Sequence, residues 1–336
     1  MNRKHVRGGL AVAVIMLGAT LAQAADKVTI RAGGVAPSAD LTEILFAKPE
    51  VAKHLGQSYD YKPTHFAGTP PIITAIASGD LDIGVFSYSS FGLAIENAKL
   101  DDLRVVMDGF QDGVPGYYTG EFMVRNESPI RTIEDLKGKL VATPGAGTAL
   151  DIAVRAMMRK HSMEEKKDYT IIEAALPNQK AMLLDQKVDL AAAGTTAITD
   201  AMLKSSARVL FTQEQAVGRT QMILFAARAG FLEKNRAAVI DFLEDALSAR
   251  HFYFDPANHK EAVAIVSQYT KQPAEQLDQW IYTSHDYYRD PNGQADLGAL
   301  QANEDLLKQL GFLKAQIDVK KHSGLDLVAE AAKRVK

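Results

Sequence analysis

A unit that occurs twice in the chain limits the folds that the sequence can adopt. Residues 75–83 read Ala-Ile-Ala-Ser-Gly-Asp-Leu-Asp-Ile, the end of a helix followed by a tight turn, an acidic residue and an apolar strand. Residues 182–190, Met-Leu-Leu-Asp-Gln-Lys-Val-Asp-Leu, repeat this order. Strands that alternate with helices form mainly parallel sheets covered by those helices. The pattern therefore predicts an α/β protein with two similar halves, chance similarity of short units being the alternative.

Short apolar strands and helical segments alternate around both units. We expect strands at 28–32, 59–63, 81–86, 103–108, 140–142, 169–173 and 188–192. Helices are expected at 40–48 and 70–78, after 87–90, from 148 to about 160, at 178–185 and after 194–196. The last third of the chain reads as helices at 235–252, 259–268, 273–283, 299–310 and 325–336, which we expect to cover the first half.

Two extended segments, 116–124 and 221–227, connect the halves and form a natural hinge. The predicted fold is two-lobed, and each lobe is a mixed, mainly parallel sheet flanked by helices. The first lobe would contain 25–116 and 222–336, and the second 117–221. A chain of this length fits two domains, although one large domain is the alternative.

The first 24 residues have the three parts of a signal peptide. Basic residues at 3, 4 and 7 precede an apolar run at 10–21 and the small-x-small sequence Ala22-Gln23-Ala24. The apolar run is shorter than the ~20 residues that a membrane-spanning helix needs. The chain has no cysteine, which excludes a lipid-anchored lipoprotein and any disulfide framework. We therefore expect residues 1–24 to be removed and the rest to be free in the periplasm.

The charge balance excludes some partners. Without residues 1–24 the chain keeps 35 basic and 41 acidic residues, a net charge of −6. This balance argues against binding to nucleic acid or to an anionic membrane surface. We expect no membrane insertion and a monomeric protein.

Three segments resemble the periplasmic binding proteins for alkanesulfonates, taurine, nitrate and related solutes. Residues 77–84 resemble the family's A-x-G-x-x-D-I-G segment, and 133–142 resemble its D-L-K-G-K-x-V-A segment. Residues 186–191 stand where the family has x-G-x-V-D-A, with Gln in place of the expected Gly before the strand. The resemblance covers about residues 27–270. It implies a Venus-flytrap fold that holds a small-molecule ligand between its lobes, performs no catalysis and delivers the ligand to a membrane permease with its ATPase.

Ligands of α/β sheets bind where strands end and helices begin, because helix N-termini offer unpaired N–H groups and a partial positive charge. Five segments would bring such ends to one cleft: 33–38, 68–70, 86–90, 144–148 and 194–196. Thr69 is expected as an N-cap before Pro70, and Thr148 as the N-cap of a capping box with Asp151. With two tyrosines of the first connecting segment, the candidate ligand-binding residues are Ser38, Thr69, Ser87, Tyr88, Ser89, Tyr117, Tyr118, Gly147, Thr148, Thr195 and Thr196.

Serine and threonine cap helices whether or not a ligand binds, so each hydroxyl also has a structural explanation. None of the five segments contains Arg or Lys, whereas highly charged ligands recruit arginine clamps. The hypothesis is therefore a small organic anion, a sulfonate or carboxylate. The aromatic residues near these segments extend it to an aromatic carboxylate. Arg31 and Arg219 are interpreted as surface charges.

Catalysis has little support in the sequence. Thiol chemistry is excluded without cysteine, and the chain has no GxSxG elbow, phosphate-binding GxxxxGK loop or zinc-type histidine spacing. We expect no catalytic residue, no metal and no cofactor. Two alternatives stay open: an enzyme on the same fold acting on a small metabolite, and a binding protein that signals to a receptor instead of an importer.

Overall fold

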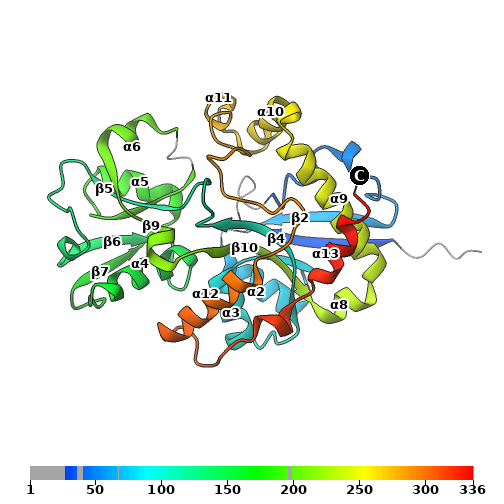
Figure 1. The fold of residues 1–336 in the computed structure, drawn as a ribbon, viewed down its shortest axis with the longest axis horizontal. Coiled ribbons are helices and arrows are strands. Elements are labelled where there is room, and N and C mark those ends of the chain that lie inside the picture. The colour runs from blue at the N-terminus through cyan, green and yellow to red at the C-terminus, as the bar shows by residue number, and fades with distance from the viewer. Residues whose placement is uncertain (1–26, 36–40, 67, 196–198, 336) are drawn as a thin grey trace, which may run out of the picture.

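The computed structural model describes residues 27–35, 41–66, 68–195 and 199–335. The expected signal peptide and two of the candidate residues, Ser38 and Thr196, lie outside these ranges. The described chain forms two lobes side by side, joined by strands that run between them (Figure 1). Within the described ranges, no helix combines the length and apolar character needed to cross a membrane.

The first lobe is built on a five-stranded sheet in the order β2-β1-β3-β10-β4. β1 is parallel to both β2 and β3, whereas β10 is antiparallel to β3 and β4. The sheet is therefore mixed, as predicted. Its strands are β1 (Val28–Gly34), β2 (Tyr59–His65), β3 (Ile83–Ser87), β4 (Leu103–Asp112) and β10 (Thr220–Arg228).

The second lobe has a three-stranded sheet, β8-β5-β9, and a parallel pair, β6-β7. A bridge between Val141 and Leu190 links the pair to the three-stranded sheet. The strands are β5 (Glu121–Arg125), β6 (Lys139–Thr143), β7 (Tyr169–Glu173), β8 (Ala191–Ala193) and β9 (Ala207–Thr212). β7 has the bounds that the sequence predicts.

Helices cover the sheets of both lobes. α2 (Thr69–Ser78), α3 (Tyr88–Asn97) and α12 (Leu297–Gln309) pack with one another or on β3 and β10. α9 (Arg236–Phe254) packs on β2, α13 (Leu325–Ala332) on β4, and α8 (Ala229–Lys234) and α10 (His259–Thr270) against α9. The C-terminal helices thus cover the first lobe, as expected. In the second lobe the helices are α4 (Ala149–Lys160), α5 (Leu176–Leu184), α6 (Ala201–Ser206) and α7 (Gln213–Val217).

The two sequence units have the same local structure, which confirms the internal repeat. Asp82 and Asp189 each accept a backbone N–H from the neighbouring parallel strand, at Arg31 (2.9 Å) and Leu140 (3.0 Å). Each also donates its own N–H to the carbonyl of that same residue. The acidic residue of each unit therefore joins two strands at equivalent places in the two lobes.

The turns before these aspartates are also equivalent. Gly79 ends α2 with a φ of 79°, and Gln186 follows α5 with a φ of 61°. In each lobe the next two N–H groups donate to one carbonyl of the preceding helix, that of Ala75 or Met182. Gln186 thus adopts the left-handed conformation that favours glycine.

Three sequence expectations about secondary structure are wrong. The segment expected as a helix at 40–48 forms turns over 42–46, and Leu41 has a φ of 65°, which no helix accommodates. The helix expected over 273–283 is a single turn, α11 (Ala274–Leu277), followed by irregular chain with buried aromatic rings. The first connecting segment, 116–124, is extended only from Glu121, where β5 begins, because the chain turns between Gly113 and Gly120. The second segment, 221–227, is extended as predicted and lies within β10.

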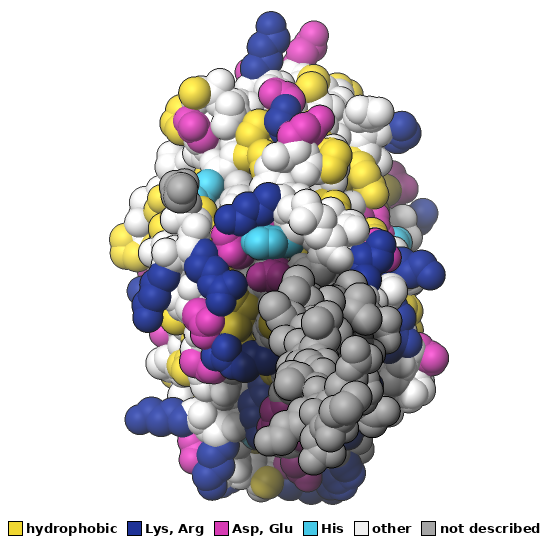
Figure 2. Space-filling model, turned by 90° about the vertical axis from the view of Figure 1, so that its right-hand side faces the viewer, with side chains coloured by type: hydrophobic (Ala, Val, Ile, Leu, Met, Phe, Trp, Pro, Cys, Tyr) yellow, Lys and Arg dark blue, Asp and Glu magenta, His cyan; other side chains and the backbone are white. Residues whose placement is uncertain are grey.

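The end of the first lobe farthest from the second lobe is shown in Figure 2. Lys and Arg side chains are intermixed there with Asp and Glu, and the hydrophobic side chains are scattered. A mixed surface of this kind is typical of a solvated face.

Candidate functional site

The starts of α3 and α4 meet at the boundary between the lobes. Tyr88, the first residue of α3, donates its hydroxyl hydrogen to the carbonyl oxygen of Ala149, the first residue of α4, over 3.2 Å. Gly147 lies against α3, since a Cβ at this position would be 3.0 Å from Leu93 Cδ1. Two helix starts that the sequence places at one cleft are therefore adjacent.

The hydroxyls at the start of α3 bond to one another. Ser87 is the N-cap, and its Oγ accepts the N–H of Ser90 over 3.2 Å. The same oxygen lies 3.0 Å from the hydroxyl of Ser89, and both side chains are buried. The structural role that the sequence allows for these serines is therefore present.

The polar groups of the loop before α4 are also hydrogen-bonded within the protein. Thr148 is the N-cap, as predicted, and accepts the N–H of Asp151 over 3.4 Å. The expected capping box is wrong in one bond, because the Asp151 carboxylate accepts from Gly147 (2.9 Å) instead of from Thr148. The N–H of Ala146 donates to Glu173 (3.0 Å). Two carboxylates of the protein thus already occupy N–H groups that the sequence offers to an anion.

Two helices begin at residues other than those that the sequence predicts. Thr69 is the first residue of α2, and Gly68, not Thr69, is its N-cap. Thr195 is half-buried after β8, and among the described residues the next α-helix begins at Ala201. Its N-cap is Asp200, whose carboxylate accepts the N–H of Leu203 (2.9 Å). A carboxylate outside the Gly-Thr-Thr sequence therefore caps this helix.

The two tyrosines of the first connecting segment contact a part of the chain that the sequence does not link to the cleft. Tyr118 lies edge-on to Tyr287 (ring centroids 5.0 Å apart), and Tyr117 lies edge-on to Tyr288 (5.1 Å). Tyr287 also stacks on Phe110 at 4.4 Å. The Tyr118 hydroxyl donates to the carbonyl of Ala193 in the second lobe (3.2 Å). An aromatic cluster therefore spans the lobe boundary.

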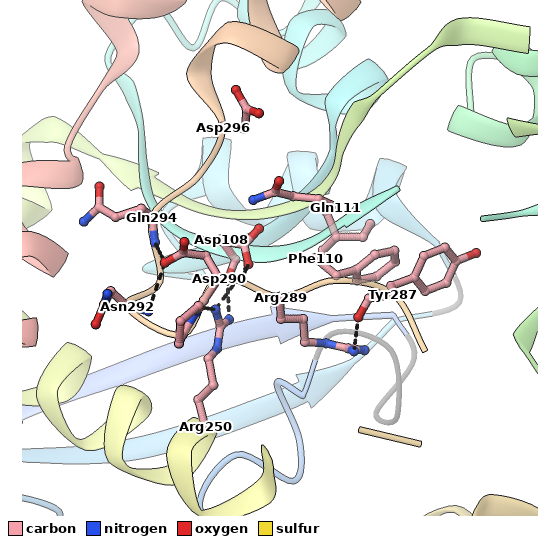
Figure 3. Close-up of polar contacts among 12 residues, drawn as sticks. Asp108, Phe110, Gln111, Arg250, Tyr287, Arg289, Asp290, Asn292, Gln294 and Asp296 are labelled. Carbon is pink, nitrogen blue, oxygen red and sulfur yellow. Dashed lines mark hydrogen bonds and ion pairs between the residues drawn. The ribbon is translucent and has the colours of Figure 1, made fainter. Parts of the chain in front are cut away.

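A buried ion pair fixes this part of the chain to the first lobe (Figure 3). Arg250 of α9 lies 3.2 Å from the carboxylate of Asp108, and the two side chains are 2 % and 0 % exposed. Arg250 also donates to the carbonyl of Asp290 (2.7 Å), and the Asp290 N–H donates to Asp108 (2.9 Å). The Asp290 carboxylate in turn accepts the N–H groups of Asn292 and Gln294. These bonds fix the backbone that carries Tyr287, Tyr288 and Arg289.

A cavity of about 360 Å³ lies between the end of α9 and this segment. Five aromatic rings, two arginines and a histidine line it, and no Asp or Glu is among its described lining residues. These are Tyr117, Arg250, His251, Phe254, Tyr282, Thr283, Ser284, Tyr287, Tyr288, Arg289 and Pro291.

A second cavity, of about 520 Å³, shares Tyr117 and Ser284 with the first. Met123 and Ala207 of the second lobe form one of its walls, and Ser284 and His285 of the first lobe form another. Tyr118 also lines it. We call the two cavities together the junction site, because their walls come from both lobes and from the segment that joins them.

The junction site contains an arginine that sequence reasoning missed. Arg289 is 6 % exposed, pairs with Asp286 (2.9 Å) and lies over the rings of Phe110, Phe254 and Tyr282 at 5.4–6.0 Å. It is distant in sequence from all five predicted segments. The density of aromatic residues around 280–288 is the signal that could have drawn attention to it.

Tyr282 and Tyr287 of the junction site are hydrogen-bond donors at neutral pH. Burial raises the pKa of Tyr282 and that of Tyr287 well above the usual value, so both phenols keep their protons. The Tyr282 hydroxyl is buried and has no hydrogen-bond partner among the described residues. A buried polar group of this kind is satisfied by water or by a ligand.

The two arginines considered from the sequence have other roles. Arg31 forms a two-pronged ion pair with Asp82 (2.8 and 2.6 Å), and Arg219 pairs with Asp296 (3.0 Å). Neither is among the residues that line the junction site. Their side chains are 40 % and 46 % exposed, which agrees with their interpretation as surface charges.

Known structures share this fold. The periplasmic aliphatic sulphonate binding protein SsuA from Escherichia coli is 18% identical with a TM-score of 0.69, over 88% of this chain and 91% of its own. The periplasmic nitrate-binding protein NrtA from Synechocystis PCC 6803 is 16% identical with a TM-score of 0.71, over 93% and 90%. The desulfurization enzyme DSZB is 11% identical with a TM-score of 0.65, over 92% and 99%. At these identities the likeness concerns the fold, and it confirms the predicted two-lobed architecture.

Sequence comparisons place the chain in a family. No curated protein matches it significantly. The profile of the family described as NMT1/THI5 like matches residues 67–258, which is more than half of the chain and includes strands of both lobes. The chain belongs to the NMT1/THI5-like family and has the two-lobed fold of periplasmic binding proteins.

Proposed function

We propose that this protein is the periplasmic solute-binding component of an ABC importer and that it holds a small organic anion at the junction site. The observation that carries the proposal is the cavity of about 360 Å³ with its aromatic rings, arginines and unpaired Tyr282 hydroxyl. Ligand pockets commonly combine apolar walls with a few placed polar groups. The likeness to sulphonate- and nitrate-binding proteins supports an anion as the solute.

The charges of the cavity of about 360 Å³ favour a ligand with one negative charge there, whereas the second cavity adds Lys204, Arg208 and Glu121. Arg250 and Arg289 line the cavity, but each already pairs with a buried aspartate, Asp108 or Asp286. A multiply charged ligand would need cations without such partners. A carboxylate or sulfonate can instead accept hydrogen bonds from the protonated phenols, while its flat body lies against the rings. We therefore propose an aromatic carboxylate or sulfonate.

Contacts from both lobes would couple binding to closure. Tyr118 reaches the second lobe through Ala193 and the first through Tyr287. A ligand in the second cavity would touch Met123 on one side and Ser284 on the other. Because it binds the closed form better than the open form, it shifts the population towards closure. A closed, loaded protein is the form that an importer would take up.

Calorimetry of the purified protein tests the ligand class. The panel contains benzoate and p-toluenesulfonate, their neutral and cationic counterparts benzamide and benzylamine, and the small anions taurine and nitrate. We expect the aromatic anions to bind tightest. The anion proposal would be refuted if benzylamine bound tightest, or if the neutral benzamide were the one compound that bound.

A matched pair of variants tests the location. Tyr117→Ala removes a ring that is 41 % exposed and lines both cavities, and should weaken binding about tenfold, or ~1.4 kcal/mol. Tyr269→Ala removes a similarly exposed ring (45 %) on α10, outside both cavities, and should leave affinity unchanged. Equal affinity of both variants would place the ligand elsewhere.

Uptake experiments separate transport from the alternatives. A strain that lacks the gene should lose uptake of the labelled ligand, and the gene should restore it. Restored chemotaxis without uptake would identify a sensory partner. Conversion of the ligand by the purified protein would identify an enzyme.

A further inference from the structure

Three side chains that commonly bind metal ions meet in the first lobe, away from the junction site. His54 lies in the loop after the 3-10 turn η1 (Pro49–Val51), whereas Asp241 and Glu244 lie one turn apart on α9. One ligand atom from each of the three lies within 4.8 Å of the others. His54 Nε2 is 3.2 Å from Glu244 Oε2, and Nδ1 is 3.8 Å from Asp241 Oδ2.

The next residue of α9 holds the histidine loop in place. Asp245 is fully buried, and its Oδ2 accepts the backbone N–H groups of His54 (2.9 Å) and Leu55 (3.0 Å) and the hydroxyl of Tyr59 (2.8 Å). The position of His54 relative to α9 therefore depends on its backbone and not on its own side chain. Such support from a neighbouring group is what preorganises metal sites.

Each carboxylate directs one oxygen to the histidine and the other to a surface cation. In Glu244, Oε2 faces His54 and Oε1 faces Lys53. In Asp241, Oδ2 faces His54 and Oδ1 lies 3.4 Å from Arg334. Lys53 and Arg334 are 62 % and 42 % exposed, so both can move into solvent. Glu244 itself is 2 % exposed. A metal would bind a single ring nitrogen of His54 together with one oxygen from each carboxylate, and one such set of three atoms lies within 4.8 Å of one another.

We propose that His54, Asp241 and Glu244 form a zinc site with water as a fourth ligand. Zinc accepts imidazole and carboxylate together, whereas calcium and magnesium prefer oxygen ligands alone. In a tetrahedral site, ligand atoms ~2.1 Å from the ion are about 3.4 Å apart, close to the His54–Glu244 separation of 3.2 Å. The histidine is 25 % exposed, which leaves room for solvent at the open position.

Zinc would fasten the loop after η1 to the middle of α9. These parts are 190 residues apart in sequence, and the unfolded chain does not hold them together. An ion that binds only the folded protein stabilises it by mass action. The melting temperature should therefore rise with zinc concentration. None of the three ligands lines the junction site, so solute binding should be independent of this metal.

The test uses untagged protein treated with EDTA and then titrated with ZnCl2 by calorimetry. We expect one zinc per chain, and a cobalt-substituted form with the visible absorption of a four-coordinate site. His54→Ala and Asp241→Asn should each weaken zinc binding at least about tenfold. His54→Ala keeps the backbone bonds to Asp245, so its melting temperature without metal should stay near that of the wild type.

The matched control is His259→Ala. His259 is 26 % exposed and faces one carboxylate, Asp278, at 3.1 Å. Its loss should leave the zinc affinity unchanged. Zinc binding that is absent in the wild type, or equally strong in His54→Ala, would overturn the proposal and show that the cluster is an ion-pair network only. Neither result would affect the solute panel, because none of the three residues lines the junction site.

Discussion

The hydroxyl of Tyr88 and the carbonyl oxygen of Ala149 lie 3.2 Å apart and join the first turns of two helices that belong to different lobes. Tyr88 is fully buried, and burial raises the pKa of its phenol above the usual range, so the hydroxyl remains a donor. We expect this bond to break when the lobes move apart. If it does, the bond reports on closure.

Tyr88→Phe should shift the protein towards the open form. The change removes one buried hydrogen bond, about 0.5–1.5 kcal/mol, and keeps the ring. Solution X-ray scattering without ligand should show a larger radius of gyration. Tyr253→Phe is the control, because Tyr253 donates to the carbonyl of Ile44 within the first lobe. An equal change in both variants would contradict a role in closure.

Asp112 at the end of β4 should make stability depend on pH. Burial raises the pKa of its carboxyl to about 6, against the hydrogen bonds from Thr119 (2.5 Å) and Gly120 (2.9 Å) that lower it. The folded state then holds the proton more tightly than the unfolded state, whose pKa is ~3.9. The free energy of unfolding therefore falls as pH rises from about 4 to 6, and the contribution of Asp112 stays constant above that range.

The size of the effect follows from the shift, about 3 kcal/mol across that window. Urea denaturation at a series of pH values should show a steeper fall in the wild type than in Asp112→Asn. Subtracting the two curves isolates Asp112 from other buried carboxyls. Parallel curves would mean that Asp112 does not titrate in this range.

The matching turns of the two lobes allow a pair of opposite substitutions. Gln186→Gly relieves a left-handed conformation and should stabilise the protein by roughly 0.5–1 kcal/mol. Gly79→Gln introduces the same strain at the equivalent position, where a Cβ would meet no atom within 4 Å, and should destabilise by a similar amount. Thermal denaturation of both variants measures this. Shifts of the same sign would contradict the equivalence.

Glu304 on α12 is expected to lower stability at neutral pH. Both carboxylate oxygens are buried without a hydrogen-bond partner among the described residues, and burial raises the pKa well above its usual value. The unfolded chain ionises above pH ~4.3, so the penalty grows as pH rises from there. Glu304→Met keeps the volume and should stabilise by roughly 1–3 kcal/mol at pH 7. The stabilisation by Glu304→Met should be smaller at pH 4 than at pH 7. Equal stabilisation at the two pH values would refute this explanation.

Much of the fold follows from local patterns in the sequence. The bounds of β7 and the start of α4 at its Thr148 cap are predicted correctly, because period and capping act within a few residues. The segment at 40–48 is predicted wrongly. Its apolar residues fit a helix, but Ile44 and Leu45 are buried against the first-lobe core through turns instead. Tertiary burial overrides local propensity there.

The sequence by itself determined the two-lobed α/β architecture, because its repeated helix-turn-strand unit and the alternation of apolar segments depend only on neighbouring residues. Only the tertiary structure decided which side chains share a site. Tyr117 meets Tyr288, and His54 meets Glu244, although about 170–190 residues separate the members of each pair. Such proximity results from how sheets and helices pack. It cannot be predicted from residue spacing in a single sequence, because spacing reports only on neighbouring residues. The architecture was therefore predictable, and both proposed sites emerged from packing.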